Sequence, residues 1–243
     1  MLLAIDTSTD NISLALAQDN RVLVEFTWRC GQNHSVELLP RLAYLMERAS
    51  VDLKSFSGVV VALGPGSFNG LRVGVTTAKG LAFSLNIPVA GVSTLETSAY
   101  QHAETGLPVC PISNAGRDEV ATALFQQKDG EWLRLMEEHI TTVDAICAGI
   151  RDKTVFCGEF VPAIAIRLRE ELGEKAVIPP WAALVRRAGF LAELGQRRLE
   201  AGKHDNPSTL QPLYLRKPAI TTPKRRITLT GGEKDDKLAH DTP

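Results

Sequence analysis

The 243-residue chain lacks paired cysteines, an excess of charge of either sign and long hydrophobic runs. Its four cysteines, Cys30, Cys110, Cys147 and Cys157, form no Cys-x-x-Cys pair and predict reduced thiols. A net charge of −1 gives no global field that would recruit nucleic acid. The apolar start ends at Asp6 without a basic flank, and no apolar run reaches the length of a membrane span. We therefore expect a cytoplasmic globular protein with no membrane contact.

Paired histidines and an activated serine are also missing. Zinc or iron bound on one helix needs two histidines about one turn apart. The five histidines, at positions 34, 102, 139, 204 and 240, are too far apart for that. Ser67 lies in Gly-Ser-Phe-Asn-Gly, where the following glycine is one place too far from the serine for the Gly-x-Ser-x-Gly nucleophile motif. The sequence therefore predicts no metal, no cofactor and no catalytic residue of these kinds.

The most distinctive stretch is a glycine-rich turn between a predicted strand and a predicted helix. A β-branched run stops at Gly64-Pro65-Gly66, and Ser67 stands where a helix N-cap would stand. The turn ends without the Gly-Lys-Ser/Thr of a P-loop, and its spacing does not match a dinucleotide fingerprint. A tight turn is our preferred interpretation, with anion binding at the helix N-terminus as the alternative.

The order of predicted elements repeats. The first half predicts strands at 2–6, 12–17 and 21–27, a helix at 35–49, a strand at 58–63, a helix at 67–85, a strand at 88–92 and a helix at 93–104. The second half predicts strands at 108–113, 119–127 and 131–138, a helix at 142–148, a strand at 154–157, a helix at 162–172, a strand at 176–178 and a helix at 182–202. Both halves read βββαβαβα.

Two tandem βββαβαβα units describe the α/β architecture shared by actin, sugar kinases and Hsp70 ATPases, in which nucleotide lies between two facing lobes. We expect an N-terminal lobe over residues 1–106 that serves for dimerisation, and a C-terminal lobe over residues 107–216. Residues 217–243 have no hydrophobic periodicity and predict a disordered tail.

The glycine-rich turn also carries a resemblance. Residues 64–72, Gly-Pro-Gly-Ser-Phe-Asn-Gly-Leu-Arg, resemble the signature GPGSFTGLR of the TsaB (YeaZ) family, with Asn69 in place of the usual threonine. Shorter matching segments at residues 3–8, 34–40, 91–95 and 212–216 extend the likeness to about residues 1–216.

The resemblance implies a role in making threonylcarbamoyladenosine in tRNA. It implies that the chain binds a TsaD-type transferase through its N-terminal lobe, and that a TsaE-type ATPase acts on this heterodimer. The transferase modifies adenosine 37 and the chain meets tRNA only through the complex. A homodimer is expected when the partner is absent. The resemblance thus implies a non-catalytic scaffold subunit.

Two predicted helices offer surfaces for that pairing. The helix at 35–49 has two apolar stripes, and the helix at 67–85 has small residues one turn apart. We predict that the interface consists of Leu38, Leu42, Leu45, Gly70, Leu71, Gly74, Val75 and Ala78. Gly74→Arg should then abolish pairing without unfolding the chain. Burial of both stripes inside one domain is the alternative.

A small-molecule kinase or ATPase of the same fold is the alternative function. The turn Asp6-Thr7-Ser8 has groups suited to phosphates and could be a vestigial phosphate-binding turn. Many TsaB relatives have an acid at the equivalent turn of the second half, but here Asn114 stands there, and an amide cannot attract a dication. Asp118 could replace the acid only if the turn were shifted. We prefer an Asp6 that hydrogen-bonds turn amides.

The basic residues after the second half have two interpretations. Arg216, Lys217, Lys224, Arg225 and Arg226 form a cluster without acidic residues. A solvated tail is the preferred interpretation, and contact with tRNA phosphates is the alternative.

Overall fold

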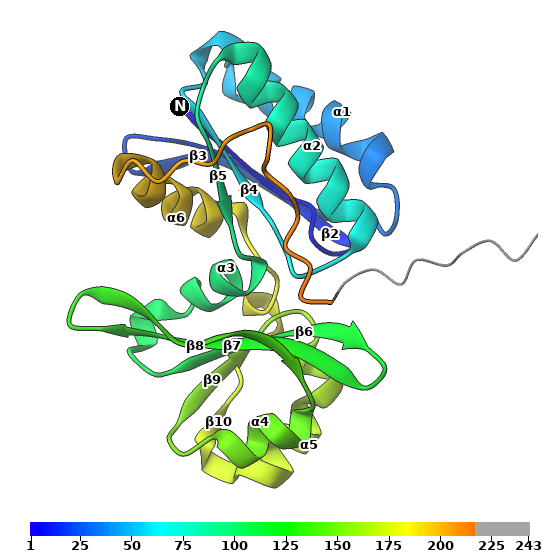
Figure 1. Ribbon diagram of the computed structural model, residues 1–243, viewed down its shortest axis with the longest axis vertical. Coiled ribbons are helices and arrows are strands. Elements are labelled where there is room, and N and C mark those ends of the chain that lie inside the picture. Colours follow the sequence, from blue (N-terminus) through cyan, green and yellow to red (C-terminus); the bar gives the residue numbers. More distant parts are fainter. Residues whose placement is uncertain (217–243) are drawn as a thin grey trace, which may run out of the picture.

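The computed structural model describes residues 1–216 and contains two five-stranded sheets, one above the other (Figure 1). The first consists of β1 (Leu2–Asp6), β2 (Asn11–Gln18), β3 (Arg21–Arg29), β4 (Gly58–Ala62) and β5 (Val89–Val92). The second consists of β6 (Val109–Gly116), β7 (Glu119–Lys128), β8 (Glu131–Thr141), β9 (Thr154–Cys157) and β10 (Ala176–Val177). The predictions for the tail at 217–243 lie outside the described residues.

The two sheets have the same topology. Their orders are β3-β2-β1-β4-β5 and β8-β7-β6-β9-β10. In each sheet the first three strands pair antiparallel, and the fourth and fifth strands pair parallel to the first and fourth. The predicted pair of tandem α/β lobes is therefore confirmed.

Six α-helices accompany the sheets in the described residues. They are α1 (His34–Ala49), α2 (Phe68–Leu85), α3 (Thr94–Tyr100), α4 (Val143–Gly149), α5 (Val161–Leu172) and α6 (Ala188–Glu200). The predicted order is confirmed, but α6 begins at Ala188 rather than at 182. Pro179 and Pro180 and a 3-10 turn at Trp181–Ala183 occupy the chain before it. Pro40 lies inside α1.

Alternating residues of the first sheet form two cores. Leu3, Ile5, Val59 and Val61 pack against α1 and α2, while Ala4, Val60 and Ala62 pack against α6 on the opposite face. Successive side chains of a strand point to opposite faces, so these fully buried runs need a helix layer on each side.

The last helix of each half crosses to the sheet of the other half. Leu95 and Ala99 of α3 belong to the core of the second sheet, and Leu191 of α6 belongs to the core of the first. α3 and α6 consequently lie between the two sheets (Figure 1). The range 107–216 predicted for the second lobe therefore needs correction, since α6 packs on the first sheet. A Cβ at Gly195 would lie 2.2 Å from Val60, which shows how closely α6 approaches it.

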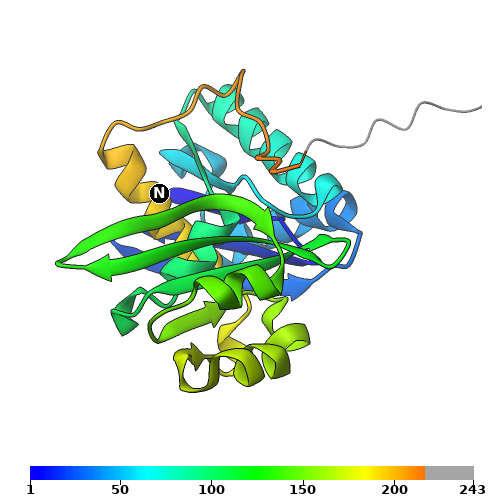
Figure 2. The same cartoon turned by 60° about the horizontal axis from the view of Figure 1, so that its bottom comes forward.

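The segment after α6 also returns to the first lobe. Residues 203–216 pass β5, where Asp205 pairs with Val89, and then run alongside α2 (Figures 1 and 2). Leu210 is buried in the core, its carbonyl accepts from Lys79 Nζ at 3.0 Å, and Leu213 N donates to Leu63 O at 2.7 Å. The segment thus ends beside the glycine-rich turn.

Within residues 1–216, no helix combines the length and the apolar character that a membrane span requires.

Candidate functional site

The glycine-rich turn docks against the turn between β1 and β2. Ser67 N donates to Ser8 O at 2.7 Å, and a Cβ at Gly66 would lie 2.1 Å from the same oxygen. Gly64 has a φ of 113°, which favours glycine. Ser67 Oγ accepts from Gly70 N at 3.3 Å, so the predicted N-cap is confirmed. Gly64, Pro65, Gly66 and Ser67 thus form a tight turn that holds α2 against β1.

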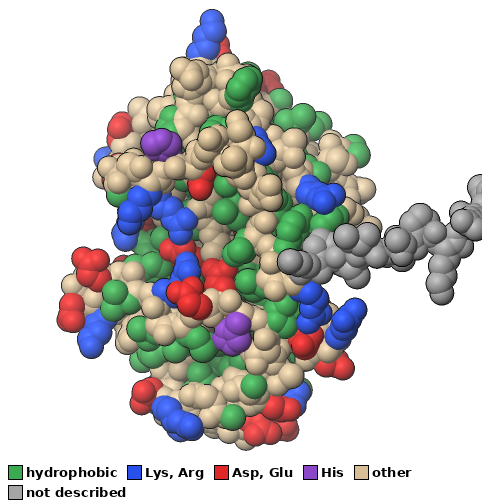
Figure 3. All heavy atoms as spheres, viewed as in Figure 1, with side chains coloured by type: hydrophobic (Ala, Val, Ile, Leu, Met, Phe, Trp, Pro, Cys, Tyr) green, Lys and Arg blue, Asp and Glu red, His purple; other side chains and the backbone are tan. Residues whose placement is uncertain are grey.

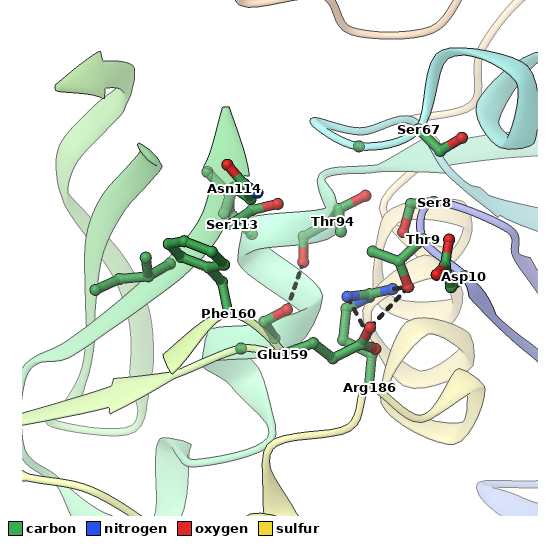
Figure 4. Close-up of a pocket in the computed structure, with 15 residues that line it drawn as sticks. Ser8, Thr9, Asp10, Ser67, Thr94, Ser113, Asn114, Glu159, Phe160 and Arg186 are labelled. Atoms are coloured by element: carbon green, nitrogen blue, oxygen red, sulfur yellow. Dashed lines mark hydrogen bonds and ion pairs between the residues drawn. The ribbon is translucent and has the colours of Figure 1, made fainter. Parts of the chain in front are cut away.

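A cavity of about 460 Å³ lies between the two lobes (Figure 4). The first lobe contributes Ser8, Thr9, Asp10, Gly66 and Ser67, and the other side contributes Thr94, Leu95, Ser98, Ile112, Ser113, Asn114, Gly158, Glu159 and Phe160. Arg186, from the segment that leads into α6, completes the lining. The alternative function of a kinase or ATPase would need a nucleotide between the lobes, so the chemistry of this cavity bears on the choice between the two functional hypotheses.

Arg186 is the central group of this cavity. Its Nε donates to Asp6 Oδ2 at 2.9 Å, its Nη2 donates to Thr9 Oγ1 at 2.9 Å, and its Nη1 lies 3.3 Å from Glu159 Oε1. Thr9 Oγ1 also donates to Glu159 Oε2 at 2.8 Å. The side chain of Arg186 is only 5% exposed. Burial opposes its charge, but the carboxylates of Asp6 and Glu159 raise its pKa above the ordinary value.

The turn Asp6-Thr7-Ser8 is occupied by internal contacts. Asp6 Oδ1 accepts from Ser8 N at 2.9 Å and from Ser8 Oγ at 2.5 Å, while Oδ2 accepts from Arg186. Thr7 Oγ1 donates to Gly70 O at 2.8 Å. The preferred interpretation of Asp6 as an acceptor for turn groups is therefore confirmed. A magnesium nucleotide does not fit these residues, because a guanidinium already neutralises the acid that would hold the metal.

The second turn does not supply a replacement acid. β6 continues through Asn114, whose Oδ1 accepts from Gly116 N at 2.8 Å, and the hairpin turns at Arg117 and Asp118. Asp118 is exposed at the tip and does not line the cavity. Among residues 1–216, no cluster of three or more His, Cys, Asp or Glu side chains is arranged to hold a metal ion.

The predicted interface residues are buried in the first lobe itself. The structure buries Leu38, Leu42, Leu45, Gly70, Leu71, Gly74, Val75 and Ala78. A Cβ at Gly74 would lie 2.2 Å from Thr7 Oγ1, so the stripe of small residues admits the chain's own β1 turn rather than a partner helix. The choice of these eight residues as a partner surface is wrong for this structure, and Gly74→Arg would disrupt the fold.

The other apolar stripe of α1 is the one that faces solvent. Val36 is 70% exposed and Leu39 58% exposed, and Pro40 and Ala43 are exposed beside them. Phe83 on α2 is 80% exposed. The sequence showed both apolar stripes of α1, but it did not show which of them packs against the sheet and which faces solvent.

The chain has the two-lobed fold that actin-like ATPases share. Component A of (R)-2-hydroxyglutaryl-CoA dehydratase from Acidaminococcus fermentans has this fold, with a TM-score of 0.51 at 11% identity over 82% of this chain and 98% of that chain.

Closer relatives define the family. Residues 29–224 match the family model described as TsaD, tRNA N6-adenosine threonylcarbamoyltransferase. The tRNA threonylcarbamoyladenosine biosynthesis protein TsaB of Bacillus subtilis is 34% identical, covering 88% of this chain and 93% of the relative. YeaZ from Pseudomonas aeruginosa has a TM-score of 0.74 at 25% identity, covering 87% of this chain and 99% of that chain. The chain belongs to the TsaB (YeaZ) family, which takes part in tRNA threonylcarbamoyladenosine formation.

Proposed function

We propose that the chain is a non-catalytic scaffold subunit that binds a TsaD-type transferase for threonylcarbamoylation of tRNA adenosine 37. The observation that carries this proposal is the Arg186 guanidinium between Asp6 and Glu159 in the cleft. A family member that keeps the two-lobed fold but fills the metal position with its own side chain is suited to binding rather than to phosphoryl chemistry.

The exposed stripe of α1 is the surface we assign to the transferase. Val36, Leu39 and Ala43 recur at helical spacing and are exposed, with Pro40 between them. Apolar side chains that are grouped on one helix face gain most when a partner covers them. The same stripe would form a homodimer in the absence of the transferase. A TsaE-type ATPase would act on the heterodimer, tRNA would be reached through the complex, and the assembly would work in the cytoplasm.

Co-elution with the TsaD-type protein of the same organism on size exclusion tests the pairing. Leu39→Asp should abolish the heterodimer peak, because it places a charge within the apolar stripe. Ile166→Asp is the matched control, since Ile166 is 73% exposed on α5 in the second lobe. Equal co-elution of the two variants would contradict the assigned surface.

The kinase or ATPase alternative has its own readout. The isolated chain should show no ATP turnover and no magnesium-dependent ATP binding. Turnover by the isolated chain that is lost in Asp6→Ala would replace the scaffold proposal with the enzymatic one.

A further inference from the structure

The buried guanidinium of Arg186 bridges the two lobes. We propose that Arg186 is an intramolecular substitute for a metal nucleotide: it joins the acidic ends of the two lobes and keeps the cleft closed without a ligand. The inference concerns the isolated chain and does not depend on the transferase.

The three charged groups come from three separate parts of the fold. Asp6 ends β1 in the first sheet, Glu159 follows β9 in the second sheet, and Arg186 lies in the segment between β10 and α6. Figure 4 shows Thr9, Glu159 and Arg186 pointing toward one another. Because Thr9 Oγ1 bonds to both Arg186 and Glu159, a hydroxyl of the first lobe also holds the acid of the second.

Charge balance requires a cation at this position. The side chains of Asp6 and Glu159 are only 2% and 19% exposed, so their carboxylates are poorly hydrated and would repel each other if left alone. A metal nucleotide brings its cation only when it binds. Arginine stays protonated at every pH at which proteins fold, so Arg186 supplies the cation permanently.

The position of Arg186 in the chain extends its effect to α6. Arg187 and Ala188 follow directly, and Ala188 N donates to Ser13 Oγ at 2.9 Å. The ion pair therefore fixes the point at which the chain leaves the second lobe and α6 begins to pack on the first sheet. Loss of the guanidinium would leave the segment that leads into α6 unattached at this position, and would leave the carboxylates of Asp6 and Glu159 without their counter-ion.

A second cluster of charged side chains also links the lobes and would keep them attached when Arg186 is replaced. Arg198 on α6 lies 2.6 Å from Glu96 on α3, and Arg134 on β8 lies 3.7 Å from the same carboxylate. Figure 3 shows basic and acidic side chains side by side at the waist between the lobes. We therefore expect an Arg186 variant to remain folded with a wider and more variable cleft.

Pulsed electron spin resonance distances between the lobes test the proposal. Spin labels at Ser55→Cys and Glu170→Cys report on the two lobes, since both positions are exposed. Cys147→Ser removes the half-buried native thiol, while Cys30, Cys110 and Cys157 are buried. Arg186→Ala should lengthen and broaden the distance distribution. Arg187→Ala is the matched control, because Arg187 pairs with Glu25 inside the first lobe, and its distribution should match that of the wild type.

Chemical rescue separates a cation requirement from simple loss of packing. Millimolar guanidinium chloride should narrow the distribution of Arg186→Ala back toward wild type, while sodium chloride at equal concentration should not. Superposable distributions of Arg186→Ala and wild type, or no response to guanidinium, would overturn the proposal. If Arg186→Ala does not fold, the Thr9→Val variant tests the proposal instead. It removes the hydroxyl shared by Arg186 and Glu159 without leaving a buried charge, so it should broaden the distance distribution. A distance distribution identical to that of the wild type would overturn the proposal.

Discussion

Arg186 Nε lies 2.9 Å from Asp6 Oδ2, although 180 residues separate them in the chain. Both side chains are nearly inaccessible to solvent. Removing one partner of such a pair leaves the other charge buried, which typically costs about 3–5 kcal/mol. We predict a loss of about this size in the free energy of unfolding of Asp6→Asn, measured with urea. Asp10→Asn is the control, because the pair of Asp10 with Arg29 is exposed and should contribute less than about 1 kcal/mol.

Replacing glycines of α2 with alanine should change stability in opposite directions, depending on whether the added methyl group meets a neighbouring atom or only improves helix propensity. A Cβ at Gly74 would lie 2.2 Å from Thr7 Oγ1, and this hydroxyl is held by its bond to Gly70 O. Gly74→Ala should therefore destabilise the chain by about 1–3 kcal/mol. Gly80 has no atom within 4 Å of an added Cβ, so Gly80→Ala should stabilise by up to about 1 kcal/mol. Thermal unfolding of the two variants checks this, and shifts of the same sign would refute the close contact.

Glu138 should make stability depend on pH. Burial raises the pKa of its carboxyl; Ser93 and Arg134 oppose this effect, and Glu96 and Glu137 add to it. A carboxyl whose pKa is raised on folding stabilises fully below its unfolded pKa of about 4.3 and loses that contribution as pH rises through the folded pKa. Glu138→Gln should therefore raise the melting temperature at pH 7 and have little effect near pH 4.

The control for this pH dependence is Glu131→Gln on the same strand, where the side chain is exposed. Its melting temperature should follow that of the wild type across the range. A Glu138→Gln variant that is less stable than wild type at pH 7 would show that the interactions of the carboxylate with Ser93 and Arg134 outweigh the burial.

The segment after α6 should contribute to the core of the first lobe. Leu210 is 6% exposed and packs against that core. Leu210→Ala should cost about 2–4 kcal/mol by leaving a cavity. Leu213 is 37% exposed, and Leu213→Ala should cost clearly less. Urea unfolding of the two variants gives the comparison, and equal losses would place Leu210 outside the core.

The element order followed from the sequence because strand and helix periods are local properties. The β-branched run at 59–61 and the cap at Ser67 identify a strand and a helix within a few residues. The crossing of α3 and α6 between lobes could not be seen in this way, because periodicity shows that a face is apolar but not which sheet covers it. The same ambiguity led us to choose the buried stripe of α1, with Leu38, instead of the exposed stripe with Leu39.

The cleft was predictable only in part. Asp6 could be placed at the end of a strand, and a carboxylate there suggests either a metal or turn amides. Arg186 could not be singled out from the sequence, since it lay within the helix predicted at 182–202, where an arginine looks like any surface residue. Its role depends on tertiary placement beside Asp6 and Glu159. Those contacts add an internal ion pair to the turn amides that the sequence predicted as partners of Asp6.

Reconstituted tRNA modification tests the scaffold proposal most directly. The TsaD-type transferase, the TsaE-type ATPase, ATP, threonylcarbamoyl-adenylate and tRNA would be incubated with and without this chain, and modified adenosine would be measured by mass spectrometry. We predict that product requires both the transferase and this chain, and that the chain alone forms none. Equal product without the chain, or product from the chain without the transferase, would contradict the proposal.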